Sequence, residues 1–187
     1  MKIDNKLMEV VTKLNSLENI NNMFIPIPDG FEIIQNTKIG SNVIFIAKKN
    51  NTMEQFLTDG ALNTSETIEE HIKKVIDEIK KECENNPIYI GKPDIIKPYR
   101  NYANELFEFK IYAQDILVNE NSFIRQLNAY FLETESREFC QLSVSAGQYK
   151  ISEENKLLTE IQDLTNDNII LGLDDILIQI LKRINKK

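Results

Sequence analysis

The side chains that could carry out covalent or acid–base chemistry are few in this sequence. His71 is the only histidine, so one chain cannot build a histidine pair or a metal site with several histidine ligands. Cys83 and Cys140 are the only cysteines, and their spacing fits no metal-binding motif. Buried free thiols are favoured over a disulfide, because cysteine is among the most buried residue types. The sequence also lacks Gly-x-Ser-x-Gly, the phosphate loop and Gly-x-Gly-x-x-Gly, so we expect no catalytic, cofactor-binding or metal-binding residues.

Three pairs of adjacent carboxylates could in principle form an acid–base dyad or hold a metal ion. The pairs are Glu69/Glu70, Glu153/Glu154 and Asp174/Asp175. The first two lie in the first turns of predicted helices, where negative charge complements the helix dipole, and the third does so if the last helix starts after Gly172. This structural interpretation is favoured. An enzyme that uses acidic residues or a bound metal is kept as an alternative.

A small group of basic and aromatic residues is the best candidate for binding a partner. Lys97, Tyr99, Arg100 and Tyr102 fall on one predicted turn, and Tyr130 lies on the polar face of a predicted strand. The group could bind a ligand anion or a partner peptide, although tyrosines in loops more often fill apolar gaps. These five residues are the candidate partner-binding residues.

Composition and charge exclude several classes of protein. Lysine and arginine number 22 and aspartate and glutamate 29, which gives a net charge of −7. Such a chain does not suit nucleic acid, whose phosphates need a basic surface. No run approaches the roughly 18 apolar residues of a membrane span, and the N-terminus lacks the apolar core of a signal peptide. The richness in Asn, Ile and Lys is typical of AT-rich bacterial genes, and we expect a cytoplasmic protein.

Residues 1–20 carry the pattern of an amphipathic helix. A narrow apolar seam repeats at steps of four and three through Ile3, Leu7, Val10, Leu14 and Leu17. The seam could pack on the protein's own sheet, pair with a second copy in a homodimer, or dock on a partner. Packing on the sheet is favoured, because an isolated helix of this length is only marginally stable in water.

The segment 23–148 is predicted to form the sheet core of a single domain that spans residues 1–187. Prolines at 26 and 28 force extended backbone before a short strand over 31–35, and a second strand follows over 43–48. Residues 50–63 are expected to be polar and irregular.

A capped amphipathic helix over 67–84 is the clearest predicted element. Thr67 and Glu70 have the spacing of a capping box, in which each side chain accepts a hydrogen bond from the other residue's backbone N–H. A long meander follows, with a turn at 97–102, and helices are expected within 152–187. The expected fold is α+β: a twisted antiparallel sheet with helices packed on one face and a polar face that stays partly exposed.

The order of these elements resembles the PsbP-like family group, which includes the photosystem extrinsic protein, a Ran-binding nuclear import factor and the bacterial DcrB-like proteins. The stretch that carries the resemblance is Pro28-Asp29-Gly30-Phe31 at the start of a strand, then Val43-Ile44-Phe45-Ile46, the capped helix and the meander. Members are mostly non-enzymatic binding modules, and one bacterial branch resembles chaperones for secreted effectors. The resemblance implies a PsbP-like fold and no catalytic residues.

The sequence therefore predicts a non-enzymatic protein-binding or adaptor module, with a chaperone-like role toward a secreted or effector protein as its narrower form. A toxin-immunity protein and an uncharacterised enzyme are the alternatives. We expect a protein partner, no nucleic acid and no cofactor, and we leave a homodimer open.

Overall fold

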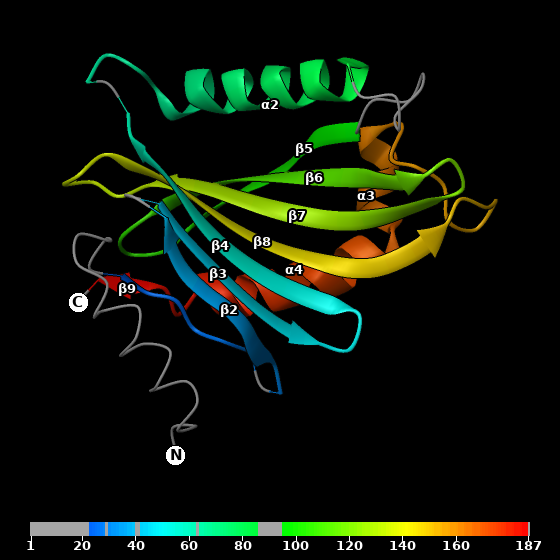
Figure 1. Cartoon of the computed structure of the whole chain (residues 1–187), viewed down its shortest axis with the longest axis horizontal. Coiled ribbons are helices and arrows are strands. Elements are labelled where there is room, and N and C mark those ends of the chain that lie inside the picture. The colour runs from blue at the N-terminus through cyan, green and yellow to red at the C-terminus, as the bar shows by residue number, and fades with distance from the viewer. Residues whose placement is uncertain (1–22, 29, 40–41, 63, 86–94, 187) are drawn as a thin grey trace.

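The computed structural model describes residues 23–28, 30–39, 42–62, 64–85 and 95–186. Along the chain these form β1 (Met23–Phe24), β2 (Glu32–Ile39), β3 (Asn42–Lys49), β4 (Thr52–Ala61), α2 (Ile68–Asn85), β5 (Ile95–Ala103), β6 (Glu108–Asn119), β7 (Ser122–Leu132), β8 (Glu138–Lys150), α3 (Ile161–Asn166), α4 (Asn168–Leu181) and β9 (Asn185–Lys186). Figure 1 shows one large sheet with helices packed on it. The expected class, α+β with an antiparallel sheet, is confirmed.

Two meanders make up the sheet, and α2 connects them. The seven strands lie in the order β2-β3-β4-β8-β7-β6-β5, and every neighbouring pair is antiparallel. The pairing of β4 with β8 joins the first meander to the second. A short turn closes the β3–β4 hairpin, and at Asn50 in this turn the backbone takes a φ of 52°, which asparagine tolerates better than most residues. A separate two-stranded sheet pairs β1 with β9.

One face of the sheet carries the main hydrophobic core. Alternate residues of β6, β7 and β8 point to this face and are almost fully buried, among them Phe109, Leu127 and Val144. α4 covers them with a stripe that includes Leu173 and Leu177, and α3 packs on the same face. Burial of each large side chain contributes about 1.5–3 kcal/mol, so this interface dominates the stability.

α2 packs on the opposite face. Its capping box forms as predicted: the Thr67 N–H donates to Glu70 Oε2 at 2.9 Å, and the Glu70 N–H donates to Thr67 Oγ1 at 3.2 Å. Ile72, which is 1% exposed, joins a second cluster with Tyr130 and Phe139. Tyr130 lies between two residues of the main core on β7, so its side chain points away from that core. α3 and α4 therefore share one face, as expected of the helices, whereas α2 lies over the other.

A buried ion network fixes the start of α4 on the sheet. Arg125 on β7 and Asp115 on β6 are cross-strand partners, both 0% exposed, and the Arg125 Nε and Nη2 groups donate to the two Asp115 oxygens at 2.8 and 2.9 Å. The Arg125 Nη1 group donates to Asp167 Oδ2 at 2.6 Å. Asp167 also caps α4, because its Oδ1 accepts from the Ile170 N–H at 2.8 Å.

The connection before α3 is held by the same network. The Arg125 Nη2 group donates to the Lys156 carbonyl at 2.6 Å, and Asp115 Oδ2 accepts from the Leu158 N–H at 2.8 Å. Burial opposes the charged form of Arg125, yet its hydrogen bonds and the two aspartate charges leave the Arg125 pKa above its usual value. The network thus ties β6, β7 and the C-terminal segment together.

Two sequence-based predictions for the sheet were wrong. Residues 50–63 were expected to be irregular, but most of them form β4, which pairs with both β3 and β8. The predicted turn at 97–102 lies within β5. A register shift between Pro98 and Arg100, typical of a β-bulge, and the position of β5 at the sheet edge explain how a strand accommodates this proline.

The C-terminal helices also differ from expectation. α4 begins at Asn168, several residues before Gly172, because Asp167 supplies the cap. α3 is limited to Ile161–Asn166, and Ser152 instead closes a turn by accepting from the Asn155 N–H at 3.2 Å. The predicted helix over 1–20 lies outside the described residues. No helix in the described part of the chain is long and apolar enough to cross a membrane.

Replacement of Asp115 tests the ion network. Asp115→Ala leaves the buried Arg125 guanidinium without the fully buried carboxylate that it contacts through two hydrogen bonds, and we expect it to lower the free energy of unfolding by about 3–5 kcal/mol. Asp77→Ala, at an exposed position of α2, is the control and should change it by less than about 0.5 kcal/mol. Urea denaturation followed by circular dichroism measures both values. A loss below about 1 kcal/mol for Asp115→Ala would show that the network is not a stabilising clamp.

Candidate functional site

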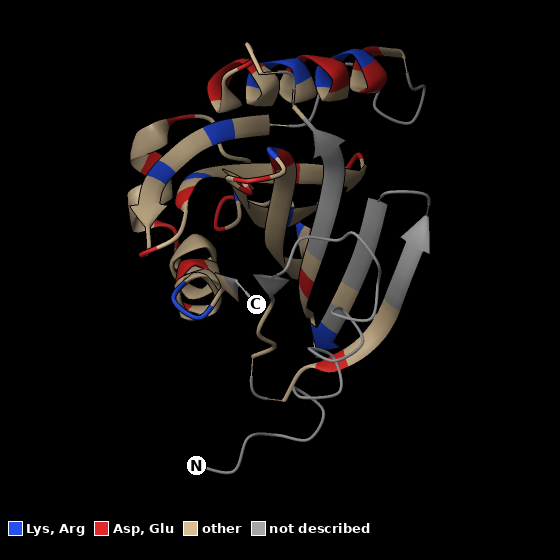
Figure 2. Ribbon diagram, turned by 90° about the vertical axis from the view of Figure 1, so that its left-hand side faces the viewer, with Lys and Arg blue, Asp and Glu red and all other residues tan. Residues whose placement is uncertain are grey.

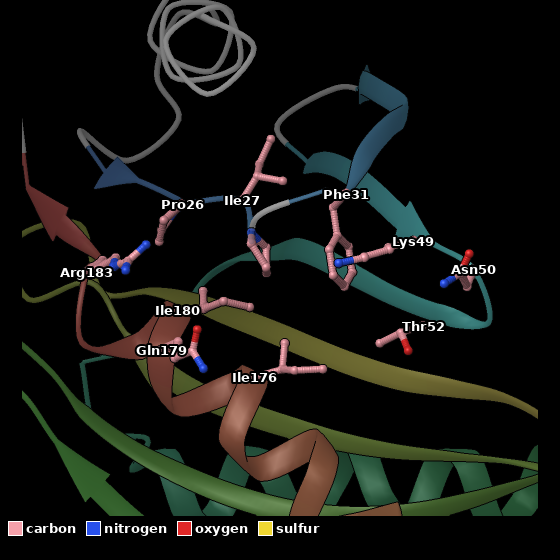
Figure 3. Close-up of a pocket in the computed structure, with 11 residues that line it drawn as sticks. Pro26, Ile27, Phe31, Lys49, Asn50, Thr52, Ile176, Gln179, Ile180 and Arg183 are labelled. Atoms are coloured by element: carbon pink, nitrogen blue, oxygen red, sulfur yellow. The ribbon is translucent and has the colours of Figure 1, made fainter. Parts of the chain in front are cut away.

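A groove opens between the end of α4, the β3–β4 hairpin and the segment that leads into β2. Its volume is about 340 Å³. One wall is the segment 26–31, and the opposite wall is formed by Ile176, Gln179, Ile180 and Arg183 of α4 and the residues just after it (Figure 3). Lys49, Asn50 and Thr52 of the hairpin close one end.

The segment 26–31 is held in place by its own sequence. Pro26 and Pro28 keep its backbone extended, while Ile27 and Phe31 are both 8% exposed and anchor it on the main core. The Phe31 N–H donates to the Pro28 carbonyl at 3.2 Å, and the turn passes through Gly30 with a φ of 81°. Glycine suits this turn, since a residue with a side chain would be strained at this φ. Its Cβ would also lie only 3.0 Å from the Lys49 amine nitrogen.

The β1–β9 pair brings this segment to the end of α4. Met23 pairs with Lys186 and Phe24 with Asn185, so the chain before the groove runs antiparallel to the chain after α4. The two walls of the groove therefore come from distant parts of the sequence and are joined by backbone pairing.

The floor of the groove is apolar, and its rim is polar and cationic. Ile27, Phe31, Ile176 and Ile180 supply the apolar surface. Arg183, Lys49, Asn50 and Gln179 are exposed residues of the lining. Figure 3 shows Arg183 beside Pro26 at one end of the groove and Lys49 with Asn50 toward the other. An apolar surface between two cations can bind a molecule that has both apolar and anionic groups.

Positive charge gathers at this end of a molecule whose net charge is −7. Figure 2 shows lysine and arginine at the end of α4 and at the end of β3. These are Lys182 and Arg183, and Lys48 and Lys49. The described residues provide no carboxylate that forms an ion pair with the Arg183 guanidinium.

A buried glutamate lies on the same sheet face as the groove. Thr52 lines the groove, and Glu54 is two residues farther along β4, so both side chains point to the face covered by α4. Glu54 is 0% exposed, and its cross-strand partner on β8 is Val144 of the main core. Neither Glu54 oxygen has a hydrogen-bond partner among the described residues. Burial raises the pKa of the Glu54 carboxyl well above its usual range, so the native state favours the neutral acid.

The residues proposed from the sequence do not form one surface. Lys97, Tyr99, Arg100 and Tyr102 lie on β5, where Tyr99 and Tyr102 are half-buried against the main core. Tyr130 is 1% exposed beneath α2, on the other face of the sheet, and burial raises the pKa of its phenol.

Arg100 has a partner within the protein. Its Nη2 group donates to both oxygens of Asp174, at 2.8 and 2.7 Å, and its Nε group donates to Asp174 Oδ1 at 3.1 Å. This bidentate contact joins β5 to the middle of α4. Asp174 was expected near the start of a helix, but its carboxylate instead serves as the partner of this arginine.

The polar sheet face is less open than the sequence suggested. Asn128 is 0% exposed and Ser143 2% exposed. The Asn128 amide donates to Gln114 Oε1 at 3.0 Å, and its oxygen accepts from Ser143 Oγ at 2.7 Å and from the Gln126 and Gln141 amides. These polar groups satisfy one another, which lets them be buried at low cost. They form an internal network and offer few groups for a ligand.

The other residues with potential chemistry have structural surroundings. The His71 ring meets Phe139 edge-on with centroids 4.5 Å apart, and its Nδ1 lies 3.4 Å from Glu66 Oε1. Glu69, in the first turn of α2, lies 3.1 Å from the Lys110 amine. Cys83 and Cys140 are both buried free thiols. Within the described residues, no group of three or more histidine, cysteine, aspartate or glutamate side chains is arranged to hold a metal ion.

Comparison of the chain with protein-family models, with curated proteins and with solved structures found no match. The site therefore has to be interpreted from its own residues.

The groove could not be predicted from the sequence, because its residues come from distant parts of the chain. Lys182 and Arg183 follow a helical pattern in the sequence, and cations at a helix C-terminus complement the dipole, so nothing in the sequence reveals that Arg183 also lines a groove. Glu54 lies in a stretch that was expected to be irregular, and nothing local distinguishes it from an exposed glutamate. The paired prolines at 26 and 28 were the one usable signal, because they indicated a fixed extended segment.

Glu54→Gln should make the protein more stable at neutral and alkaline pH. In the unfolded chain Glu54 ionises above about pH 4.3, whereas the native carboxyl stays protonated because its pKa is raised. Wild-type stability is therefore lost as the pH rises from the unfolded toward the folded pKa, and glutamine, which does not titrate, avoids this loss. We therefore compare the folding equilibrium constant of Glu54→Gln with that of the wild type. We expect the variant's constant divided by the wild type's to be near one at about pH 4 and to rise by at most about tenfold per pH unit above it.

Urea denaturation of both proteins between about pH 4 and pH 8 measures this ratio. Glu84→Gln, at an exposed position of α2, is the control and should follow the wild type at every pH. If Glu54→Gln and the wild type have the same pH dependence, Glu54 is not the buried titrating group that the structure describes.

Proposed function

We propose that the protein is a non-enzymatic binding protein that docks a segment of a partner protein in the groove between α4 and residues 26–31. The observation that carries the proposal is a preformed groove with an apolar floor and a polar, cationic rim. Protein interfaces commonly have this organisation, with an apolar centre surrounded by polar groups.

The shape of the groove favours a chain segment over an enclosed small molecule. Its volume of about 340 Å³ is at the lower end of the roughly 300–1,000 Å³ typical of ligand pockets. Lys49, Asn50, Gln179 and Arg183 line it and are exposed, so one side of the groove is open to solvent. A pocket that buries most of a small ligand needs more enclosure, whereas an open groove accommodates a few side chains of a longer chain.

Several cations outside the groove are paired with carboxylates of the protein itself. Asp174 neutralises Arg100, Asp115 and Asp167 neutralise Arg125, and Glu69 contacts Lys110. These pairs stabilise the fold and position α4. The groove is where exposed cations adjoin an apolar surface.

Selection from a library of random short peptides displayed on phage tests the proposal. Gln179→Trp places a bulky ring in the groove, and Gln162→Trp places the same ring at an exposed position of α3 as a control. We expect selected peptides to bind the wild type and Gln162→Trp alike, and Gln179→Trp at least about tenfold more weakly, which is a loss of about 1.4 kcal/mol. Fluorescence anisotropy gives the dissociation constants. Failure to select any peptide, or selection of peptides insensitive to Gln179→Trp, would contradict the proposal.

A further inference from the structure

We infer that the segment bound in the groove is acidic, with a carboxylate that pairs with Arg183 next to apolar residues that contact the floor. This inference rests on the proposed function and adds the chemistry of the partner. It is argued from the charges that the groove presents and from how the protein uses its other arginines.

Arg183 differs from the other three arginines of the chain. Arg100 binds Asp174, Arg125 binds two aspartates, and the Arg137 Nη2 group donates to the Glu66 carbonyl at 2.7 Å. The side chain of Arg183 is exposed, and within the described residues no acceptor is recorded for its guanidinium. A guanidinium presents a planar fork of donors that matches a carboxylate, as the Arg100–Asp174 pair shows within this protein.

The position of Arg183 suits contact with a bound segment. The Arg183 backbone N–H donates to the Ile180 carbonyl at 2.9 Å, which fixes the backbone directly after α4. Ile180, one turn earlier, is part of the apolar floor. A carboxylate at Arg183 would therefore lie next to the apolar surface, and an acidic segment could satisfy both groups at once.

The charge distribution of the whole molecule favours an acidic partner at this end. The net charge of −7 repels an anionic chain elsewhere, while Lys49 and Arg183 in the groove and Lys182 beside it attract it here. Such complementarity guides encounter and fixes the orientation of a bound segment. A basic segment would place its cations against Arg183 and Lys49, and a neutral one would offer no carboxylate to the Arg183 guanidinium.

A fluorescein-labelled peptide that alternates leucine with glutamate is the probe, and the same peptide with glutamine in place of glutamate is its neutral counterpart. We expect the wild type to bind the glutamate peptide at least about tenfold more tightly than the glutamine peptide in anisotropy titrations, and this preference should shrink as salt is raised. Arg183→Glu should weaken binding of the glutamate peptide at least about tenfold. It should also improve binding of a matching leucine–lysine peptide.

Lys182→Glu is the matched control, since it makes the same change in net charge one residue earlier, outside the groove lining. It should weaken binding less than about threefold. Arg183→Gln, which alters the charge less, should give an intermediate loss, and circular dichroism of each variant verifies that it is folded.

Three results would overturn the inference: equal binding of the glutamate and glutamine peptides, equal losses in Arg183→Glu and Lys182→Glu, or no binding of the glutamate peptide. The proposed function is judged separately by the library selection. Selected peptides that depend on the groove but are not acidic would overturn this inference and leave the proposed function standing.

Discussion

The buried guanidinium of Arg125 determines where α4 can lie, and the groove depends on that position. A charge with no exposure to water is tolerated only when carboxylates and carbonyls surround it. Asp115 comes from the neighbouring strand, but Asp167 comes from the residue that caps α4. A displacement of the start of α4 would therefore either uncap the helix or remove a partner from a buried charge.

Two further contacts align the rest of α4. The bidentate pair between Arg100 and Asp174 holds its middle to β5, and the backbone pairing of β1 with β9 holds the chain after its end beside residues 23–24. Helix and segment 26–31 are thus held in place on the core and joined to each other by the β1–β9 pairing, with an apolar floor between them. The groove is a consequence of how these elements are anchored.

Features that depend on neighbouring residues were predictable from the sequence. The Thr67–Glu70 capping box forms with the expected reciprocal hydrogen bonds, and the alternation along β6, β7 and β8 correctly separated the core face from the polar face. Features that depend on distant partners were not predictable. The strand at 97–102 is formed by pairing with β6, and Arg100 finds its carboxylate 74 residues away.

Burial was the property that the sequence revealed least. Asn128 looks like an exposed residue of a polar face, yet it is buried because four other polar side chains share its hydrogen bonds. Glu54 has no such partners and is buried all the same, next to the site where we propose that a partner binds. In both cases the alternation of residues along one strand predicts to which face of the sheet a side chain points. It does not predict which other residues cover that side chain.

The central claim is that the groove beside α4, and not the polar sheet face or α2, is the binding surface. Backbone amide chemical shifts, recorded by NMR during titration with the leucine–glutamate peptide, test it most directly. The claim predicts that the largest changes fall on the β3–β4 turn, on the residues around Phe31, and on Gln179 to Arg183. Changes centred on α2 or on the Asn128 network, or changes spread evenly over the surface, would contradict it.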